Sequence, residues 1–238
     1  MIRVNKKILP DLAKFIEMRY GVSVLDAKEE TPQIMDTLLR MQYWIDDVVL
    51  SQYFSGGEGY WSNSETFETR RTGKKLIEEL KELENVEILH VGCGNNDLKE
   101  LVGENVFGID PYNPNADAKT NIEGMQKKIG EWDIVLCLGS INFGDENTIR
   151  AQIRKVVQMV KPGGKIYWRC NPGVTHANEY ARWVDFFPWT QELLDEMADT
   201  LHCDILEKGW DHAEDMELPN GNRIFNLWEK RKELRTVQ

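Results

Sequence analysis

The chain has 238 residues, of which 41% are hydrophobic and 29% are charged, as in an ordinary soluble globular protein. It contains no run of about 18 apolar residues that would predict a membrane-spanning helix. The formal net charge of -11 repels nucleic acid at long range, so nucleic acid is not an expected partner.

Residues 1–56 are predicted to form a helical extension in front of the main domain. The basic start is interrupted by Asp11, Lys14 and Glu17, which a signal peptide would not tolerate, so a cytoplasmic location is expected. A stronger helix begins at Thr31, which can cap it, and apolar residues then recur at three-to-four spacing. The stretch SGGEGYWSNS ends this pattern and predicts a loop or hinge.

Residues 57–232 are predicted to form one domain, followed by a tail over 233–238. Helices are expected over 64–83, 95–102 and 146–160, and strands over 86–91, 105–110, 132–140 and 164–170. The sequence KPGG over 161–164 predicts a helix stop and a turn. Strands that alternate with helices indicate a parallel sheet with crossover helices.

The last part of the chain follows a different pattern. A helix over 188–202 is expected, and then two strands, 203–210 and 223–231, with no helix between them. Their polar connection contains Asn-Gly, so the final strand should run antiparallel to the others. Four residues of that connection are interpreted as a solvated charge run and not as a metal site: Asp211, His212, Glu214 and Asp215.

The four cysteines are spread through the domain, at Cys93, Cys137, Cys170 and Cys203. They form no CxxC pair, and the four histidines do not cluster with them. Reduced core thiols are therefore expected, and no bound metal.

The stretch HVGCGNND, residues 90–97, combines the end of a strand with a GxG turn and the start of a helix. Such a turn presents free backbone amides and lets a ligand approach the chain closely. A dinucleotide-binding loop needs a third glycine where Asp97 stands, and this carboxylate would repel a pyrophosphate. Asp110 ends the next strand, where an acid can accept hydrogen bonds from ribose hydroxyls. A ribose-bearing cofactor without a pyrophosphate fits both features, and S-adenosylmethionine is such a cofactor.

Four motifs resemble, in order and spacing, those of class I S-adenosylmethionine-dependent methyltransferases: HVGCGNND, FGIDP, WDIVLCLGSINFG and VKPGGKIYW. The resemblance covers about residues 64–230. It implies a doubly wound, Rossmann-like α/β sheet, mostly parallel with an antiparallel C-terminal hairpin, preceded by an N-terminal helical lid. The compact form is also similar to small methyltransferase-like proteins of tailed phages.

The resemblance also implies a cofactor site. The turn over 92–94 would wrap the methionyl part, and Asp110 would hold the ribose. The segment 119–123 would flank the adenine, and 138–140 would close over the sulfonium, which Trp61 of the lid could contact by a cation–π interaction. The implied cofactor-binding residues are Tyr60, Trp61, Gly92, Cys93, Gly94, Asn95, Asp110, Pro111, Tyr112, Asn121, Ile122, Leu138, Gly139 and Ser140.

Two positions depart from the family pattern. The third glycine of the methyltransferase motif falls at position 96, one residue before that of the dinucleotide motif, and this chain has Asn96 there. Asparagine tolerates a left-handed backbone, so the turn can persist. His90 stands where the family usually has an acid, which leaves the ammonium of the cofactor without its familiar anchor unless Asp97 substitutes. These departures favour an alternative, a non-catalytic protein that uses this fold for interaction.

The expected function is transfer of a methyl group from S-adenosylmethionine to a small molecule or a protein side chain. This in-line displacement depends mainly on positioning. His176 is the candidate general base, and Asn142 is the candidate for orienting the substrate. The segment LGSINF lacks the [DNS]PP[YFW] motif of DNA amino-methyltransferases, which argues against a DNA substrate. A further alternative uses the same cofactor for aminopropyl transfer or for its own cleavage.

Overall fold

The apolar runs of the sequence form one six-stranded sheet in the computed structural model, which describes residues 50, 53–54, 64–174, 181, 184–212 and 222–232. In chain order the strands are β1 (Ile88–Val91), β2 (Val106–Ile109), β3 (Trp132–Leu138), β4 (Val160–Cys170), β5 (Cys203–Trp210) and β6 (Ile224–Lys230). Their spatial order is β2-β1-β3-β4-β6-β5. Every residue of β1 is buried, as expected for a strand covered on both faces.

The strand directions confirm the mixed sheet that the sequence predicts. β1 pairs in parallel with both β2 and β3, and β3 pairs in parallel with β4. β6 is antiparallel to β4 on one side and to β5 on the other. The carboxyl ends of the first four strands therefore lie at one edge of the sheet, where ligands of open α/β sheets bind.

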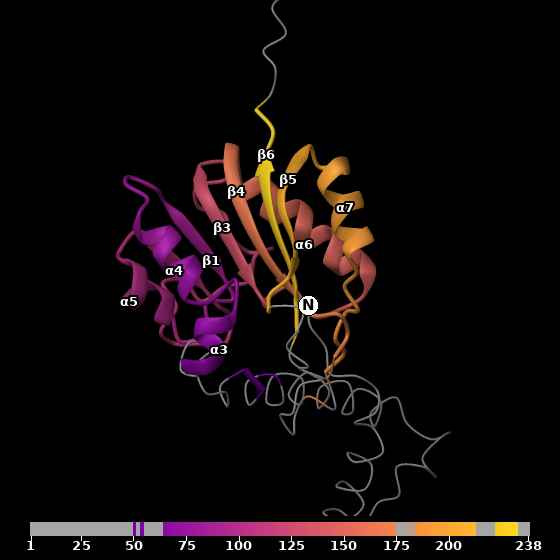
Figure 1. Cartoon of the computed structure of the whole chain (residues 1–238), viewed down its shortest axis with the longest axis horizontal. Coiled ribbons are helices and arrows are strands. Elements are labelled where there is room, and N and C mark those ends of the chain that lie inside the picture. Colours follow the sequence, from indigo (N-terminus) through magenta and orange to yellow (C-terminus); the bar gives the residue numbers. More distant parts are fainter. Residues whose placement is uncertain are drawn as a thin grey trace, which may run out of the picture.

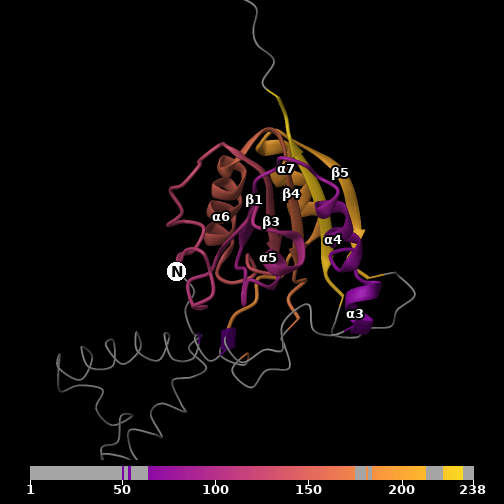
Figure 2. The same cartoon turned by 90° about the vertical axis from the view of Figure 1, so that its left-hand side faces the viewer.

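Helices cover the two faces of this sheet. They are α3 (Ser64–Thr69), α4 (Lys74–Lys81), α5 (Asp97–Val102), α6 (Glu146–Met159) and α7 (Gln191–Thr200). Figures 1 and 2 show α3, α4 and α5 on one side of the sheet and α6 and α7 on the other. None of the described helices is long and apolar enough to cross a membrane.

Each helix begins or packs for a local reason. The side chain of Asp145 accepts a hydrogen bond from the amide of Thr148 at 2.8 Å, which caps α6. The hydroxyl of Thr190 caps α7 in the same way. On α6, the residues that face the sheet recur at three-to-four spacing: Ile149, Gln152, Ile153, Val156 and Val157.

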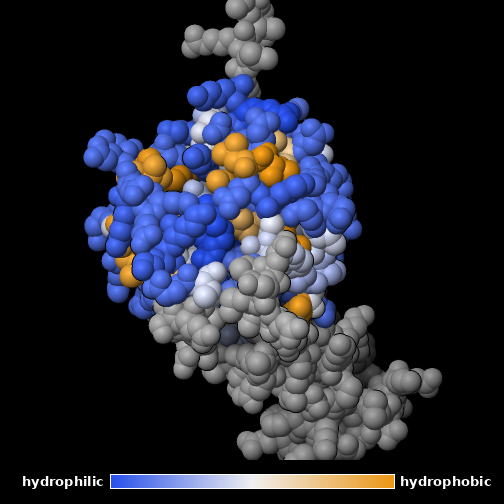
Figure 3. Space-filling model, in the orientation of Figure 1, coloured by the Kyte–Doolittle hydropathy of each residue, from blue (hydrophilic) through white to orange (hydrophobic). Residues whose placement is uncertain are grey.

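The space-filling view shows hydrophilic residues over most of the described surface on this face, with apolar residues in small separate patches (Figure 3). Among the described residues the large exposed apolar side chains are Leu83, Ile129, Leu206 and Trp210.

Two local predictions need correction. The helix expected over 64–83 is two helices, α3 and α4, because the chain turns at 70–73. A Cβ at Gly73 would lie 2.0 Å from the carbonyl oxygen of Phe67, so this turn requires a glycine. The KPGG sequence lies within β4, where it forms a bulge: the pairing with β3 shifts register there, and Gly163 has a φ of +79°.

The interpretation of Asp211 and His212 as solvated charges is also wrong, since their exposed fractions are 1% and 2%. One carboxylate oxygen of Asp211 accepts hydrogen bonds from the amide and the hydroxyl of Thr72, at 2.9 and 2.7 Å. The other accepts from Nε of Arg169 at 2.7 Å. The backbone amide of Asp211 donates to the carbonyl of Arg223 at 2.7 Å. Asp211 thus joins the α3–α4 turn to the ends of β4, β5 and β6.

Replacing Asp211 with alanine should lower the free energy of unfolding by about 3–5 kcal/mol, because Arg169 loses the carboxylate of a buried ion pair. Urea unfolding measures the change. The control is Asp195→Ala, which removes an exposed pair with Lys208 and should cost at most about 1 kcal/mol. Equal losses in the two variants would contradict the role assigned to Asp211.

Candidate functional site

Three loops meet at the carboxyl edge of the sheet and enclose a cavity of about 240 Å³. Gly92 and Gly94 follow β1, Asp110 follows β2, and Gly139 follows β3. The described residues that line the cavity are Phe54, Val91, Gly92, Gly94, Asp110, Pro111, Tyr112, Thr120, Asn121, Ile122, Glu123, Leu138, Gly139, Ser140, Ile141 and Gln152.

The two glycines of the turn serve different purposes. A Cβ at Gly92 would lie 2.2 Å from the Cβ of Ser140, so only glycine allows the loops after β1 and β3 to approach. Gly94 also has a positive φ, of +54°, but a Cβ there would meet no atom within 4 Å. The missing side chain of Gly94 thus leaves open space at the cavity, which a ligand can occupy.

Asp110 holds these loops together. It is buried, and its backbone amide bonds to the carbonyl of Ala118. One carboxylate oxygen accepts from the amides of Tyr112 and Asn113, at 2.8 and 2.9 Å. The other accepts from the amide of Gly94 at 3.2 Å. A carboxylate has about four acceptor positions, so the second oxygen keeps one for a hydroxyl group of a ligand.

The turn tolerates the residue that replaces its third glycine. Asn96 adopts the left-handed conformation, with a φ of 66°, directly before α5. Its side-chain amide donates to the carbonyl of Asn115 and to the carboxylate of Asp117, both at 3.2 Å. Asparagine can therefore take the place of glycine here, because it tolerates the left-handed conformation and its side chain is held by the segment after β2.

Aromatic side chains form one wall of the cavity. The ring of Phe54 stacks on that of Tyr112, with centroids 4.8 Å apart, and meets Phe143 edge to face at 5.3 Å. Phe54, Tyr53 and Leu50 are the described part of segment 1–56, and of these Phe54 lines the cavity. The lid role of the whole segment stays a prediction.

The lining of the cavity also has polar and acidic side chains. Gln152 of α6 donates to the carboxylate of Glu123 at 2.7 Å, beside the buried Ile122. Glu123 and Asp110 are the charged residues among the described lining, and no basic side chain is present in that set. This balance suits a ligand with a positive charge and disfavours a polyphosphate.

Ten of the implied cofactor residues line the cavity, and two do not. Cys93 is buried behind the turn, and its burial, with Asp110 nearby, raises the pKa of its thiol to about 12, so it is not a ready nucleophile. Asn95 is exposed and accepts from the side chain of Asn113. Asp97 lies in the first turn of α5 and does not line the cavity.

Three of the predicted residues, Tyr60, Trp61 and His176, lie outside the described residues. Asn142 is 2% exposed, and both ends of its carboxamide are engaged. It donates to the carbonyl of Gly139 at 2.8 Å and accepts from the amide of Asn171 at 2.9 Å. This geometry favours a role in joining the loops after β3 and β4, and contact with a substrate stays a prediction.

Comparison with known proteins identifies the fold. Neither protein-family models nor curated proteins give a match to this sequence. Among solved structures, the Burkholderia thailandensis 1,6-didemethyltoxoflavin-N1-methyltransferase, with bound 1,6-didemethyltoxoflavin and S-adenosylhomocysteine, is similar with a TM-score of 0.56 and 14% identity. The alignment covers 85% of this chain and 92% of that one.

Two further structures extend the comparison. The N-methyltransferase NodS from Bradyrhizobium japonicum, in complex with S-adenosylhomocysteine, gives a TM-score of 0.50 at 14% identity over 72% of this chain and 95% of that one. The [4+2]-cyclase SpnF gives 0.51 at 14% identity over 79% and 94%. Likeness at this identity establishes the fold, which is the Rossmann-like fold of class I methyltransferases.

Four lining residues were not predicted from the sequence. Val91 and Ile141 directly adjoin the turn and the third loop, so a wider motif would have included them. Gln152 is a buried polar residue in the apolar stripe of α6, and its position in that stripe could have been recognised from the sequence. Phe54 belongs to a separate segment, and only the tertiary structure brings it to the cavity.

His90 lies on β1, next to the turn, but does not line the cavity. It is 4% exposed, and burial lowers the pKa of its imidazole to about 4. Its Nδ1 has no hydrogen-bond partner among the described residues. The histidine is therefore a neutral core residue and does not replace the acid of the family as a charged anchor.

The buried neutral His90 should make the fold sensitive to acid. Its folded-state pKa lies below the unfolded-state value near 6.5, so the unfolded chain binds the proton more tightly. Stability is full above about pH 6.5 and falls toward pH 4. Between pH 7 and 5 the loss from this residue should be about 2 kcal/mol.

Urea unfolding at both pH values, on the native protein and on His90→Leu, measures this contribution. The variant lacks the titrating ring, so its loss of stability should be smaller than that of the native protein by this amount. An identical pH dependence in both proteins would show that His90 is not held neutral.

Proposed function

We propose that this chain is a methyltransferase that takes a methyl group from S-adenosylmethionine and places it on a small molecule or a protein side chain. One observation supports this most: the glycine turn and Asp110 line a single cavity whose described charged groups are acidic. An adenosine with a cationic sulfonium fits such a cavity, whereas a dinucleotide does not.

Each part of the cavity would hold one part of the cofactor. The second carboxylate oxygen of Asp110 would accept a ribose hydroxyl while the first stays bonded to the backbone. Tyr112 and Ile122 would flank the adenine. Gly94, whose missing Cβ leaves open space, would lie against the methionyl part. S-adenosylmethionine supplies the activated methyl group on its sulfonium.

The acceptor would enter beside the loops after β3 and β4. Ser140 lines the cavity next to the close contact with Gly92, which would fix the position of the sulfonium end. Methyl transfer then requires that the acceptor be held in line and that water be excluded, which Phe54 and Tyr112 would favour by stacking over the opening. His176 is retained as the candidate base for an acceptor that carries a proton.

A second function of the same cavity stays open, because the [4+2]-cyclase SpnF has this fold. The fold thus does not by itself specify methyl transfer. A methyltransferase produces S-adenosylhomocysteine. An enzyme that transfers an aminopropyl group would produce methylthioadenosine, and one that catalyses a cyclisation would leave the cofactor unchanged. A non-catalytic protein would bind no adenosine ligand. Mass spectrometry of the adenosine products after incubation with candidate acceptors separates these cases.

Titration calorimetry with S-adenosylmethionine and S-adenosylhomocysteine tests the proposal. The native protein should bind both ligands, and Asp110→Ala should weaken binding at least about tenfold, because a ribose hydroxyl loses a charged acceptor. The matched control is Asp97→Asn. Asp97 is an acid in the first turn of α5 that does not line the cavity, so this variant should bind as the native protein does.

Circular dichroism shows whether the Asp110 variant keeps its fold, since the same carboxylate bonds three backbone amides. Absence of binding by the native protein, or equal weakening in both variants, would overturn the assignment of the cavity to this cofactor.

A further inference from the structure

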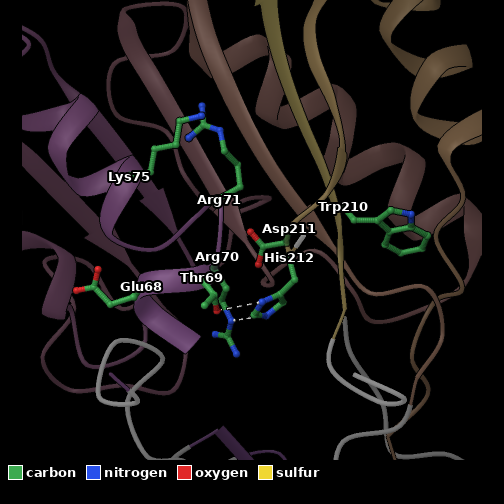
Figure 4. Close-up of a pocket in the computed structure, with 8 residues that line it drawn as sticks. All are labelled: Glu68, Thr69, Arg70, Arg71, Lys75, Trp210, Asp211 and His212. Carbon is green, nitrogen blue, oxygen red and sulfur yellow. Dashed lines mark hydrogen bonds between the residues drawn. The ribbon is translucent and has the colours of Figure 1, made fainter. Parts of the chain in front are cut away.

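A second cavity, of about 390 Å³, lies between the α3–α4 turn and the carboxyl end of β5. It shares no lining residue with the first cavity. Three basic side chains line it: Arg70, Arg71 and Lys75. In Figure 4 the head groups of Arg71 and Lys75 lie at one end, and the hydrogen-bonded pair of Arg70 and His212 lies at the other. The volume is within the usual range for ligand pockets.

The acids that line this cavity already have partners outside its lining. Glu68 forms an ion pair with Lys74 at 3.2 Å. Asp211 is fully buried, and its carboxylate bonds Thr72 and Arg169. Neither carboxylate therefore depends on the three basic side chains for its charge.

Arg71 is the most constrained of the basic residues. Its side chain is 10% exposed and lies over the ring of Phe225, at 4.9 Å from the centroid. Its Nε and Nη2 bind Glu207 and Glu79, but Nη1 is buried with no hydrogen-bond partner in the described part of the chain. A buried donor without a partner is costly, so the guanidinium of Arg71 is not fully satisfied by its two carboxylate partners.

His212 orients Arg70 at the other end. Nε of Arg70 donates to Nε2 of the imidazole at 3.1 Å, so that nitrogen carries no proton. The proton is then on Nδ1, which lies 3.4 Å from the hydroxyl of Thr69. Burial first, and the charge of Arg70 second, lower the pKa of His212 and keep the ring neutral. The pair of Arg70 and His212 therefore carries one positive charge, which is on the guanidinium of Arg70.

Further basic side chains lie near the cavity. Arg169 binds the carboxylate of Asp211, which lines the cavity. Arg223 is 6% exposed, and its pKa is lowered to about 10, by burial first and then by the nearby Arg169 and Arg70. A negatively charged group close to these guanidinium groups would be attracted to them.

We propose that this second cavity binds an oxyanion, a phosphate or carboxylate group, at the end where the head groups of Arg71 and Lys75 lie, with Arg70 adding its positive charge from the other end. Guanidinium groups bind planar or tetrahedral oxyanions through paired N–H donors, and the lysine adds a mobile charge at the mouth. This site is independent of the proposed methyltransferase function, since it uses none of the residues of the first cavity.

Titration calorimetry with inorganic phosphate, at constant ionic strength set with chloride, tests the site. Sodium acetate is the second arm, which distinguishes a carboxylate from a phosphate. Lys75→Gln removes an exposed charge and should fold normally, and it should weaken anion binding about tenfold through the lost charged hydrogen bond. Arg70→Gln should act in the same direction.

Lys81→Gln is the matched control, because it removes the same charge from an exposed residue of the same helix, α4, that does not line the cavity. Binding of phosphate or of acetate that is weakened by the Lys75 change and not by the Lys81 change supports the site and identifies the group. Absence of binding to the native protein, or equal weakening in both lysine variants, overturns it. Binding of S-adenosylhomocysteine, measured separately, tests only the first cavity.

Discussion

The parallel pairing of β1 with both β2 and β3 is the constraint on which the rest of the structure depends. Because all three strands end at the same edge, the glycine turn, Asp110 and the loop that begins at Gly139 must meet there. Two close contacts then fix the cavity. Gly92 lies against Ser140 without room for a side chain, and the carboxylate of Asp110 binds the amide of Gly94.

The two cavities at this edge differ in their described basic residues. The first cavity is lined by acids and by aromatic and apolar side chains with no basic residue, whereas three basic residues line the second beside Glu68 and Asp211. Asp211 lies at the second, where its carboxylate joins the α3–α4 turn to Arg169. Arg169 also approaches the loop after β3, because a Cβ added to Gly139 would lie 3.5 Å from its Nη1. One buried ion pair thus supports both cavities.

The comparisons specify the fold more closely than the reaction. Methyltransferases and a cyclase share it with this chain at 14% identity. What separates one reaction from another in such a fold is the side chains at the loop ends. In this chain those include Asp110 at the end of β2 and Ser140 after β3, and Gln152 of α6 adds a polar group to the same cavity.

The sequence by itself determined the order of the elements, the antiparallel last strand and most of the first cavity. These features depend on local signals: buried strands are apolar, glycines mark turns, and an acid that ends a strand is recognisable from its neighbours. Asn96 belongs with them, because its short side chain predicts the left-handed turn that it forms.

Only the tertiary structure decided the remaining features, because they depend on residues far apart in the chain. The break between α3 and α4 has one local signal, Gly73, but the hydrogen bonds that hold it run from Thr72 to Asp211, 139 positions later, and no local pattern reveals them. For the same reason Asp211 and His212 looked like surface charges in a polar connection, yet they are buried against residues of the α3–α4 region. Phe54 reaches the first cavity from another segment, and Gln152 faces it only because α6 packs on that side of the sheet.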